Sequence, residues 1–167
     1  MLKKIDPREL DDNVFRLIGD EWMLITAEFN GRVNPMTASW GGLGILWNMP
    51  VATVYVRPSR FTDSLLQKSQ AFSLAFLSPG HKKILDACGA LSGRDGDKVS
   101  RVGLTIEKLP DGGPAFREAR LILSCRVLYA HRLLPECFTS PEPEAHYPRK
   151  DYHNIYIGAV TSAYLRH

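Results

Sequence analysis

Several features are absent from this sequence of 167 residues, and each absence excludes a class of protein. No apolar run approaches the ~20 residues needed to cross a bilayer, so a membrane protein is not expected. The beginning of the chain lacks the apolar segment and cleavage site of a signal peptide, which favours a cytoplasmic protein. Three cysteines at long spacings, Cys88, Cys125 and Cys137, suit neither a disulfide framework nor a CxxC metal or redox pair.

The short motifs of several enzyme classes are also absent. The sequence contains no Walker glycine-lysine motif, no GxGxxG, no GxSxG and no histidine pair at metal-binding spacing. Asp95 and Asp97 lie in a polar loop, but the further ligands of an EF-hand are missing, so a solvated loop is favoured over a metal site. The net charge of +3 is spread along the chain without a basic arm, which gives no support to nucleic-acid binding.

What the sequence does contain is the composition of an ordinary globular protein. Hydrophobic residues make up 44% of the chain and charged residues 23%, which are usual values for that class. A chain of this length buries roughly 70% of its unfolded surface around one core, and it is short for two. No repeat, low-complexity tract or linker interrupts it, so residues 1–167 are predicted to form a single domain.

Strands are predicted wherever apolar, β-branched and aromatic residues form short runs. The run from Trp22 to Phe29 ends at Asn30-Gly31, a strong hairpin signal, so the next segment should pair antiparallel with it. Gly158 interrupts the last run, where we expect a bulge or the close approach of another group. The later runs predict strands over residues 51–56, 71–77, 104–109, 120–134 and 154–165.

Helices are predicted between these strands. Ser59 is placed to cap a helix that continues to about residue 70, with apolar residues at helical spacing. A second helix is expected over residues 81–91 and a short third one over 97–102. Residues 139–153, with three prolines and many charges, should form an exposed excursion. About seven strands with two or three inserted helices predict a mainly β, antiparallel, closed or nearly closed barrel, because the βαβ alternation of a parallel sheet is absent.

The stretch NPMTASWGG, which begins at position 34, is unusual for a strand because its residues are small or hydroxylated and end in paired glycines. In an extended chain, Thr37 and Ser39 face one side, and Met36, Ala38 and Trp40 face the other. Short side chains followed by glycines let a flat molecule approach the backbone and meet its N–H and C=O groups. An edge strand that ends in a turn is the alternative.

The segment RPSRFT joins the end of a buried strand to the start of a helix. The free N–H groups of the first helical turn then lie beside Arg57 and Arg60, and beside the hydroxyls of Ser59 and Thr62. An arginine fork matches phosphate oxygens and a helix N-terminus supplies aligned donors, so this segment predicts a phosphate site. An ordinary capped helix with solvated arginines is the alternative.

Two later segments are weaker candidates. The loop CGALSGRDGDK carries Ser92, Arg94 and Lys98, and a plain solvated loop is its alternative interpretation. His153 stands just before the last strand, where a lone histidine is usually solvent-facing, and a direct role at a site is the alternative.

Together these blocks resemble the flavin reductase-like family. The matching segments, in order, are NPMTASWGGLGILWNMPVATVYVRPSRFT, CGALSGRDGDKV, EARLILSCRVLYA and YPRKDYHNIYIGAV, which span nearly the whole chain. The likeness is to the flavoredoxin-type branch, which has RPSR-T after the long strand. The resemblance implies the FMN-binding split barrel, an antiparallel and Greek-key-like fold.

The resemblance also implies which residues hold the cofactor. The flat molecule would be the isoalloxazine ring of FMN, and because flavin N5 itself accepts the hydride, no catalytic acid, nucleophile or metal is required of the protein. The implied contacts are Met36, Thr37, Ala38, Ser39 and Trp40 around the ring, Arg57, Ser59, Arg60 and Thr62 around the phosphate, Ser92 and Lys98 from the second loop, and Tyr152 and His153 near the flavin or the nicotinamide.

The activity implied by the resemblance is that of an NAD(P)H-dependent flavin reductase, with NADH or NADPH as the hydride donor. The family implies a homodimer with the flavin near the subunit boundary, so that either chain can supply a given contact. Two alternatives remain open. One is an FMN-containing electron carrier that serves a redox protein partner, and the other is a non-catalytic barrel that binds another anion or haem.

Overall fold

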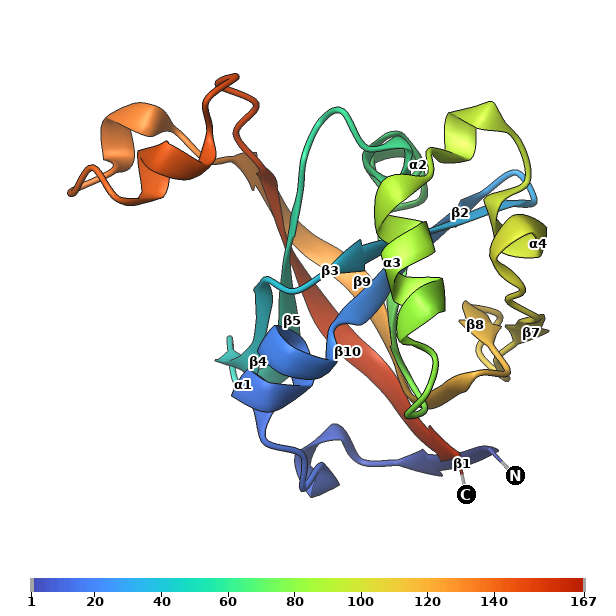
Figure 1. Ribbon diagram of the computed structural model, residues 1–167. Helices are drawn as coiled ribbons and strands as arrows, with labels where there is room; N and C mark the ends of the chain where they lie inside the picture. The colour runs from blue at the N-terminus through green and yellow to red at the C-terminus, as the bar shows by residue number, and fades with distance from the viewer. Residues whose placement is uncertain (1, 167) are drawn as a thin grey trace.

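One large antiparallel sheet organises the computed structural model, which describes residues 2–166 (Figure 1). Its strands follow the order β3-β2-β6-β9-β10-β5-β4, and β1 pairs with β10 beside this path, while β7 and β8 form a separate ribbon. The strands are β1 (Leu2–Ile5), β2 (Met23–Phe29), β3 (Arg32–Ala38), β4 (Gly41–Leu46), β5 (Met49–Val56), β6 (Ala71–Leu77), β7 (Ile106–Lys108), β8 (Pro114–Phe116), β9 (Ala119–Arg132) and β10 (Asn154–Arg166).

Helices connect these strands and cover part of the sheet. Three of them, α2, α3 and α4, lie where the sequence predicts helices, and a short α1 with a following π-helical turn was not expected. The helical segments are η1 (Pro7–Glu9), α1 (Val14–Arg16), η2 (Leu17–Glu21), α2 (Phe61–Ser69), α3 (Lys82–Ala90), η3 (Gly93–Asp95), α4 (Lys98–Val102), η4 (Pro135–Cys137) and η5 (Pro143–His146). No helix within residues 2–166 is long and apolar enough to span a membrane.

Two hairpins of the sheet have two-residue turns with positive φ angles, and the sequence predicted only one of them. Asn30 and Gly31 have φ of 50° and 76°, and Phe29 pairs with Arg32, so the predicted turn between β2 and β3 is confirmed. The β4-β5 hairpin turns in the same way through Trp47 and Asn48, with φ of 50° and 60°. Because this turn carries no glycine, the hairpin was missed, and the described residues hold ten strands where about seven were expected.

Strand β9 pairs with both β6 and β10, and its irregularity lies where Gly158 predicts it. Ile157 pairs with Tyr129 but Gly158 pairs with Val127, which leaves one extra residue on β9. A Cβ at Gly158 would lie 2.7 Å from Cε1 of Phe72, so an aromatic ring of β6 occupies the space beside this glycine. The expected bulge and the expected close approach are therefore both confirmed.

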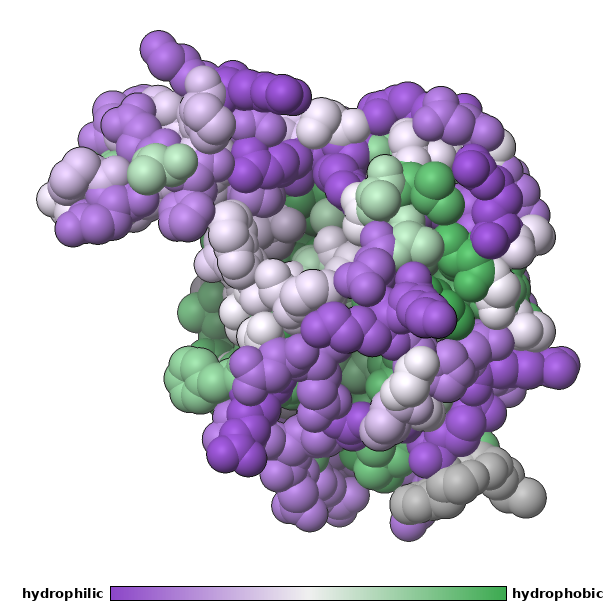
Figure 2. Space-filling view, viewed as in Figure 1, coloured by the Kyte–Doolittle hydropathy of each residue, from purple (hydrophilic) through white to green (hydrophobic). Residues whose placement is uncertain are grey.

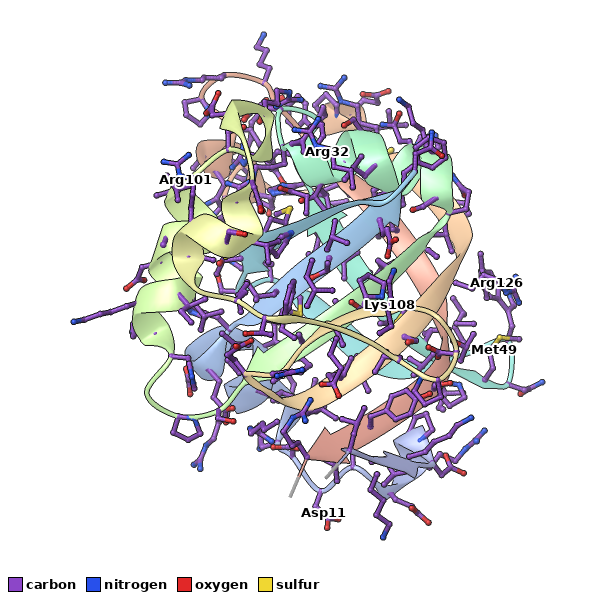
Figure 3. All side chains as sticks on the ribbon, turned by 90° about the vertical axis from the view of Figure 1, so that its right-hand side faces the viewer. Asp11, Arg32, Met49, Arg101, Lys108 and Arg126 are labelled. Atoms are coloured by element: carbon purple, nitrogen blue, oxygen red, sulfur yellow. The ribbon has the colours of Figure 1, made fainter. Side chains whose placement is uncertain are left out.

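Alternation along the strands produces two hydrophobic cores. Met23 and Ile25 on β2 join the core inside the barrel, whereas Leu24 joins a second core on the outer face of the sheet. This outer core is covered by α3, α4 and β8, which contribute Leu85, Val99 and other apolar residues. Figure 3 shows the β7-β8 ribbon, which carries Lys108, crossing the face of the sheet. The mainly antiparallel, helix-covered barrel confirms the predicted fold class.

The segment between β9 and β10, residues 133–153, projects from the barrel (Figure 1). Its surface is mostly hydrophilic in the view of Figure 2, as the prolines and charges predict. It nevertheless has its own aromatic centre, because Tyr147 and Tyr152 are buried and pack against Phe138. The two ends of the excursion are joined by a hydrogen bond from Leu133 N to His153 O, which brings Tyr147 back toward the barrel.

Candidate functional site

Eight of the thirteen predicted site residues meet where β3 ends, β5 ends and β10 begins. Asn154 at the start of β10 pairs with Val56 at the end of β5, so the residues next to them in sequence, His153 and Arg57, lie at the same edge. A hollow of about 180 Å³ opens there. It is lined by Met36, Thr37, Ala38, Ser39, Trp40, Tyr55, Arg57, Arg60 and His153.

The end of β3 forms one wall, although not in the way that strand alternation predicts. The strand stops at Ala38, so Ser39 and Trp40 lie beyond it and do not alternate faces with the residues before them. The first of the paired glycines is also required by packing within the protein. A Cβ at Gly41 would lie 2.9 Å from both Met23 Cε and Thr53 O, so the first glycine makes room for packing within the barrel.

The hydroxyl of Thr37 is already engaged by the protein. Its Oγ1 donates to the carbonyl oxygen of Leu85 at 2.5 Å, which ties β3 to α3. Met36 is buried, and Ala38 and Ser39 are half-buried. The part of this wall that remains for a ligand is therefore mainly backbone and the exposed ring of Trp40, which is 45% exposed.

Arg57 reaches the hollow from the end of β5 and is held by the excursion. Its guanidinium lies 2.7 Å from the carboxylate of Asp151 and donates to the carbonyl oxygen of His146 at 3.0 Å. The same group lies 5.1 Å from the centre of the Tyr147 ring. These contacts fix the direction of the side chain before any ligand arrives.

Arg60 is the N-cap residue of α2, so the prediction that Ser59 caps this helix was wrong. Ser59 is exposed and outside the hollow, and Arg60 occupies the N-cap position without a capping bond from its side chain. The Arg60 guanidinium instead donates to the carbonyl oxygens of Gly89 and Cys88, at 2.9 and 3.3 Å, at the end of α3. Burial lowers the pKa of this guanidinium from its usual value.

Thr62 lies behind the hollow and does not line it. It is fully buried, and its Oγ1 accepts a hydrogen bond of 2.7 Å from Nδ2 of Asn34. A Cβ on Gly93 would lie 1.9 Å from Oδ1 of that asparagine. The hydrogen bond from Asn34 on β3 to Thr62 on α2 therefore requires glycine at position 93, because any side chain there would clash with Asn34.

Three other predicted residues also lie outside the lining. Ser92 caps η3, because its Oγ accepts from the backbone N–H of Arg94 at 3.2 Å. Lys98 is only 3% exposed, and burial lowers its pKa to about 8, with the neighbouring charge of Arg60 acting in the same direction. Tyr152 is buried in the excursion, where its hydroxyl donates to the carboxylate of Glu144 at 3.1 Å.

His153 lies inside the hollow and is only 7% exposed, unlike the usual solvent-facing loop histidine. Its Nδ1 is 2.7 Å from the hydroxyl of Tyr147. Burial, followed by the positive charge of Arg57, lowers the pKa of His153 to about 4, so the ring is neutral at pH 7. A neutral imidazole has one N–H donor and one acceptor nitrogen, so this side chain offers a hydrogen bond without a charge.

Sequence reasoning missed two residues of the site. Tyr55 lines the hollow, and its position two residues before Arg57 in a strand was a usable signal, because alternate residues share a face. Tyr147 gave no such signal, since it belongs to an irregular segment whose contacts do not follow a period. Its role is visible only through its bond to His153.

A second hollow of about 480 Å³ adjoins the first. Trp40 and Tyr55 border both, and the remaining walls come from the excursion, including Leu133, Pro143 and Tyr147. The arrangement combines aromatic walls with two arginines, which suits a flat molecule with an anionic end. No group of three potential metal-ligating side chains is found among residues 2–166.

Comparisons with known proteins show the family of the chain and solved structures that share its fold. The family described as a flavin reductase like domain matches residues 15–167. No curated protein sequence matches the chain. Among solved structures, an FMN-binding protein from Thermus thermophilus with bound p-hydroxybenzaldehyde is 25% identical, with 85% of this chain and 69% of that one covered at a TM-score of 0.67.

Two further solved structures share the fold at lower identity. An FMN-binding domain of flavin reductases-like enzyme from Shewanella baltica is 18% identical, covering 99% of this chain and 77% of its own at a TM-score of 0.72. A flavoredoxin from Methanosarcina acetivorans is 23% identical, covering 97% and 76% at a TM-score of 0.70.

Proposed function

The chain belongs to the flavin reductase like domain family, and from this premise we propose that it is a cytoplasmic oxidoreductase that binds FMN where β3, β5 and β10 meet and takes hydride from NADH or NADPH. The observation that carries the proposal is the convergence of three separate sequence segments on one hollow with two arginines and a neutral histidine. The names of the similar structures, an FMN-binding protein and a flavoredoxin, support FMN as the cofactor.

The donor set of the hollow fits the phosphate of FMN. Arg57 and Arg60 line it, and both guanidinium groups are oriented by partners within the chain. Charged forks that are already oriented lose little side-chain entropy when they bind a phosphate. Lys98, buried behind Arg60, adds positive charge without reaching the ligand.

The rest of the hollow fits the flat ring. Ala38 and Ser39 leave the backbone at the end of β3 accessible, and Trp40 and Tyr55 provide aromatic walls. When bound, the flavin supplies the hydride-accepting centre. The chain then binds and orients it, and His153, with Tyr147 donating to its Nδ1, would present Nε2–H to the ligand as an uncharged donor.

We also propose that a second copy of the chain completes this site. A hollow of about 180 Å³ is smaller than the roughly 300–1,000 Å³ of usual ligand sites. Large apolar side chains are exposed on the β4-β5 hairpin and the second half of β9, namely Ile45, Trp47, Met49 and Tyr129, and Trp40 leads directly into β4. A homodimer that covers them would leave Trp40 near the subunit boundary.

Oligomeric state and flavin content test the dimer together. We expect a dimer in sedimentation equilibrium, and we expect Trp47→Lys to give monomers that retain the fold but hold FMN more weakly. A monomeric wild-type protein that binds FMN fully would overturn this part of the proposal. Ile106→Lys, on the exposed face of β7, is the control and should remain dimeric.

The first experiment on function is the visible spectrum of the purified protein, followed by identification of any chromophore that heat releases. Stoichiometric FMN, reduced by NADH or NADPH under anaerobic conditions, is the expected result. A protein that neither contains nor binds FMN would refute the proposal. Bound FMN that neither nicotinamide reduces would favour the electron carrier, which a reduced iron–sulfur protein as donor would then reveal.

A further inference from the structure

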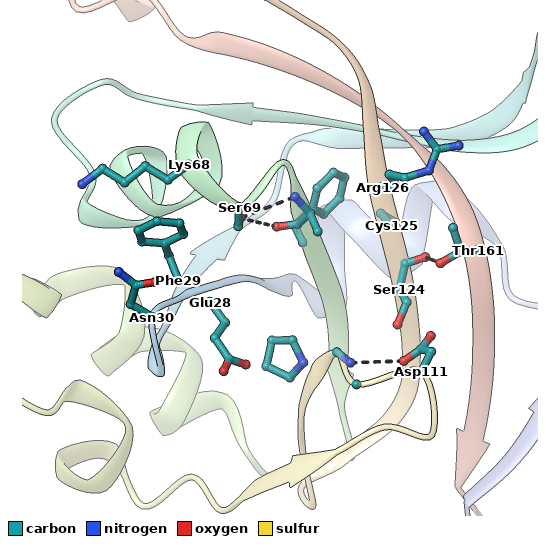
Figure 4. A pocket seen from close by; sticks show the side chains of 15 residues that line it. Glu28, Phe29, Asn30, Lys68, Ser69, Asp111, Ser124, Cys125, Arg126 and Thr161 are labelled. Carbon is teal, nitrogen blue, oxygen red and sulfur yellow. Dashed lines mark hydrogen bonds between the residues drawn. The ribbon is translucent and has the colours of Figure 1, made fainter.

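Another, larger cavity lies at the opposite end of the β2-β3 hairpin from the hollow proposed to bind FMN, which is called the FMN pocket below. Ala38 pairs with Met23 at the pocket end, whereas Phe29 pairs with Arg32 at the other end, and Phe29 lines the cavity. Its volume is about 660 Å³, within the range of small-molecule sites. Figure 4 shows the side chains around it, which come from the β2-β3 turn, the end of α2, the turn before β8, and strands β6, β9 and β10.

The sheet beneath the turn before β8 carries a row of hydroxyls. Directly paired residues of adjacent strands share a face, and the pairs Thr26 with Ser73, Ser73 with Ser124, and Ser124 with Ser162 extend across β2, β6, β9 and β10. All four residues are buried. Ser73 donates to the carbonyl oxygen of Pro114 at 2.7 Å, which fastens the turn before β8 over this row.

Ser124 is the member of the row that lines the cavity, and its hydroxyl has no partner. It is only 7% exposed, and within residues 2–166 no hydrogen bond to its Oγ is formed. A buried polar group without a partner is rare enough in folded proteins to require a cause. An absent ligand that hydrogen-bonds this hydroxyl is such a cause.

The carboxylate of Asp111 and the hydroxyl of Ser124 lie close to one empty position beside Gly113. The position that a Cβ of Gly113 would occupy lies 3.2 Å from Ser124 Oγ and 3.4 Å from Oδ1 of Asp111. Asp111 accepts a hydrogen bond from Gly113 N at 3.2 Å, which holds the carboxylate in place. Figure 4 shows Asp111 and Ser124 side by side. The missing side chain of Gly113 therefore keeps the space between two hydrogen-bond acceptors open.

The cationic side chains near the cavity are directed to other groups and leave Asp111 without an ion-pair partner. Lys68 lies with its ammonium 5.6 Å from the centre of the Phe29 ring, and Lys108 pairs with Glu28. Figure 4 shows the guanidinium of Arg126 pointing away from Asp111. Among the residues that the structure describes, no lysine or arginine forms an ion pair with Asp111.

We propose that this cavity binds a small organic amine. The ammonium group would donate to the Asp111 carboxylate and to Ser124 Oγ, and the apolar body would lie against Pro114, which is bonded to Ser73 on the same face of the sheet. Because the site shares no residue with the FMN pocket, its occupancy is independent of the proposed redox function. Thr161, which bonds to Ser124 O, is the extra residue of a second bulge in the sheet, on β10. Bulges are over-represented next to functional sites.

Calorimetric titration of the purified protein with 2-phenylethylamine tests the proposal, with 2-phenylethanol and phenylacetate as the neutral and anionic analogues. We expect saturable binding of the amine and binding about tenfold weaker or worse for both analogues. Equal binding of the amine and the alcohol, or no saturation by roughly 10 mM amine, would overturn the proposal.

Three variants locate the binding at the proposed atoms. Asp111→Asn retains an acceptor for Gly113 N but removes the charge, Ser124→Ala removes the hydroxyl, and Gly113→Ala places a methyl group between them. Each should weaken amine binding about fivefold or more while leaving the content of FMN unchanged. Gly19→Ala, where an added Cβ meets nothing within 4 Å, is the control. Unchanged amine affinity in all three variants would place the amine elsewhere and refute the assignment.

Discussion

The two ends of the β2-β3 hairpin treat their polar groups differently. At the FMN pocket, Arg57, Arg60 and His153 all have partners within the chain, which hold them in fixed directions. At the proposed amine cavity, the Ser124 hydroxyl has no hydrogen-bond partner among residues 2–166, and Asp111 accepts one bond, from Gly113 N, but has no ion-pair partner there. The first end is therefore organised before a ligand arrives, whereas the second retains unmet hydrogen-bonding capacity. The predictions below disturb one end at a time.

The largest effect is expected from Gly93→Ala at the FMN-pocket end. The added Cβ would stand 1.9 Å from Asn34 Oδ1 and 2.9 Å from Phe61 Cδ1, so the bond from Asn34 to Thr62 must break. Overpacking and the loss of a buried hydrogen bond together should lower the free energy of unfolding by about 3 kcal/mol. Urea unfolding measures this, and FMN affinity should fall with it.

The neighbouring Gly89→Ala is the matched control for that variant. Gly89 lies in α3 beside the same pocket, and its added Cβ would meet only Thr37, at 3.7 Å. Gly89 is the second-last residue of α3, and alanine is a better helix former than glycine by up to about 1 kcal/mol, so this variant should be as stable as the wild type or more so. Equal destabilisation by both variants would contradict the role given to Gly93.

The pH dependence of the unfolding free energy tests the role of the buried His153, whose ring is hydrogen-bonded to Tyr147. The pKa of His153 is about 4 in the folded protein and near 6.5 in the unfolded chain, so the unfolded state binds the proton first as pH falls. The free energy of unfolding should therefore decrease below pH 6.5 and lose about 2 kcal/mol between pH 7 and pH 5 from this group. Urea unfolding of His153→Gln should be flatter over this interval, whereas the exposed His131→Gln should follow the wild type. Identical slopes for all three proteins would remove His153 as the cause.

Arg60→Met separates the phosphate from the ring. The variant keeps an apolar stem but loses the guanidinium that is held on the carbonyl oxygens of Gly89 and Cys88. Its affinity for FMN should fall about tenfold more than its affinity for riboflavin, because only FMN carries the phosphate. Fluorescence titration measures both, and the exposed Arg117→Met controls for net charge. Equal losses for FMN and riboflavin would move the phosphate away from Arg60.

The features that the sequence predicted lie mostly at the FMN-pocket end of the β2-β3 hairpin or follow from local patterns. Local signals predicted the β2-β3 turn at Asn30-Gly31, the strand β6, the helix α2 and the short side chains at the end of β3. These features depend on neighbours in sequence, where period and turn chemistry act directly. Local signals also brought Arg57 and Arg60 together at the start of α2, whereas the presence of His153 in the same hollow was implied only by the resemblance to the family.

The features that escaped prediction depend on partners far apart in the chain. Ser59 was expected to cap α2, but Arg60 occupies the N-cap position, and its guanidinium bonds to carbonyl oxygens at the end of α3. Tyr147 reaches His153 from an irregular segment. The row of hydroxyls that includes Ser73 and Ser124 becomes visible only once the register of four strands is known. Register is a property of the sheet and not of any single strand.

The smallest expected effect is the difference in unfolding free energy between Ser124→Ala and Ser73→Ala, at two serines that pair with each other across β9 and β6. Ser124→Ala removes a buried hydroxyl that has no partner within the described residues, so the ligand-free protein should gain up to about 1 kcal/mol in unfolding free energy. Ser73→Ala should instead lose about 1 kcal/mol, because the bond to Pro114 O is broken and that carbonyl is left unpaired. Urea unfolding without amine measures both. Adding 2-phenylethylamine should stabilise the wild type more than Ser124→Ala, which reverses their order if ligand binding is what the unpaired hydroxyl serves. If Ser124→Ala is instead destabilised without amine, the hydroxyl has a partner in solution and the contrast between the two ends disappears.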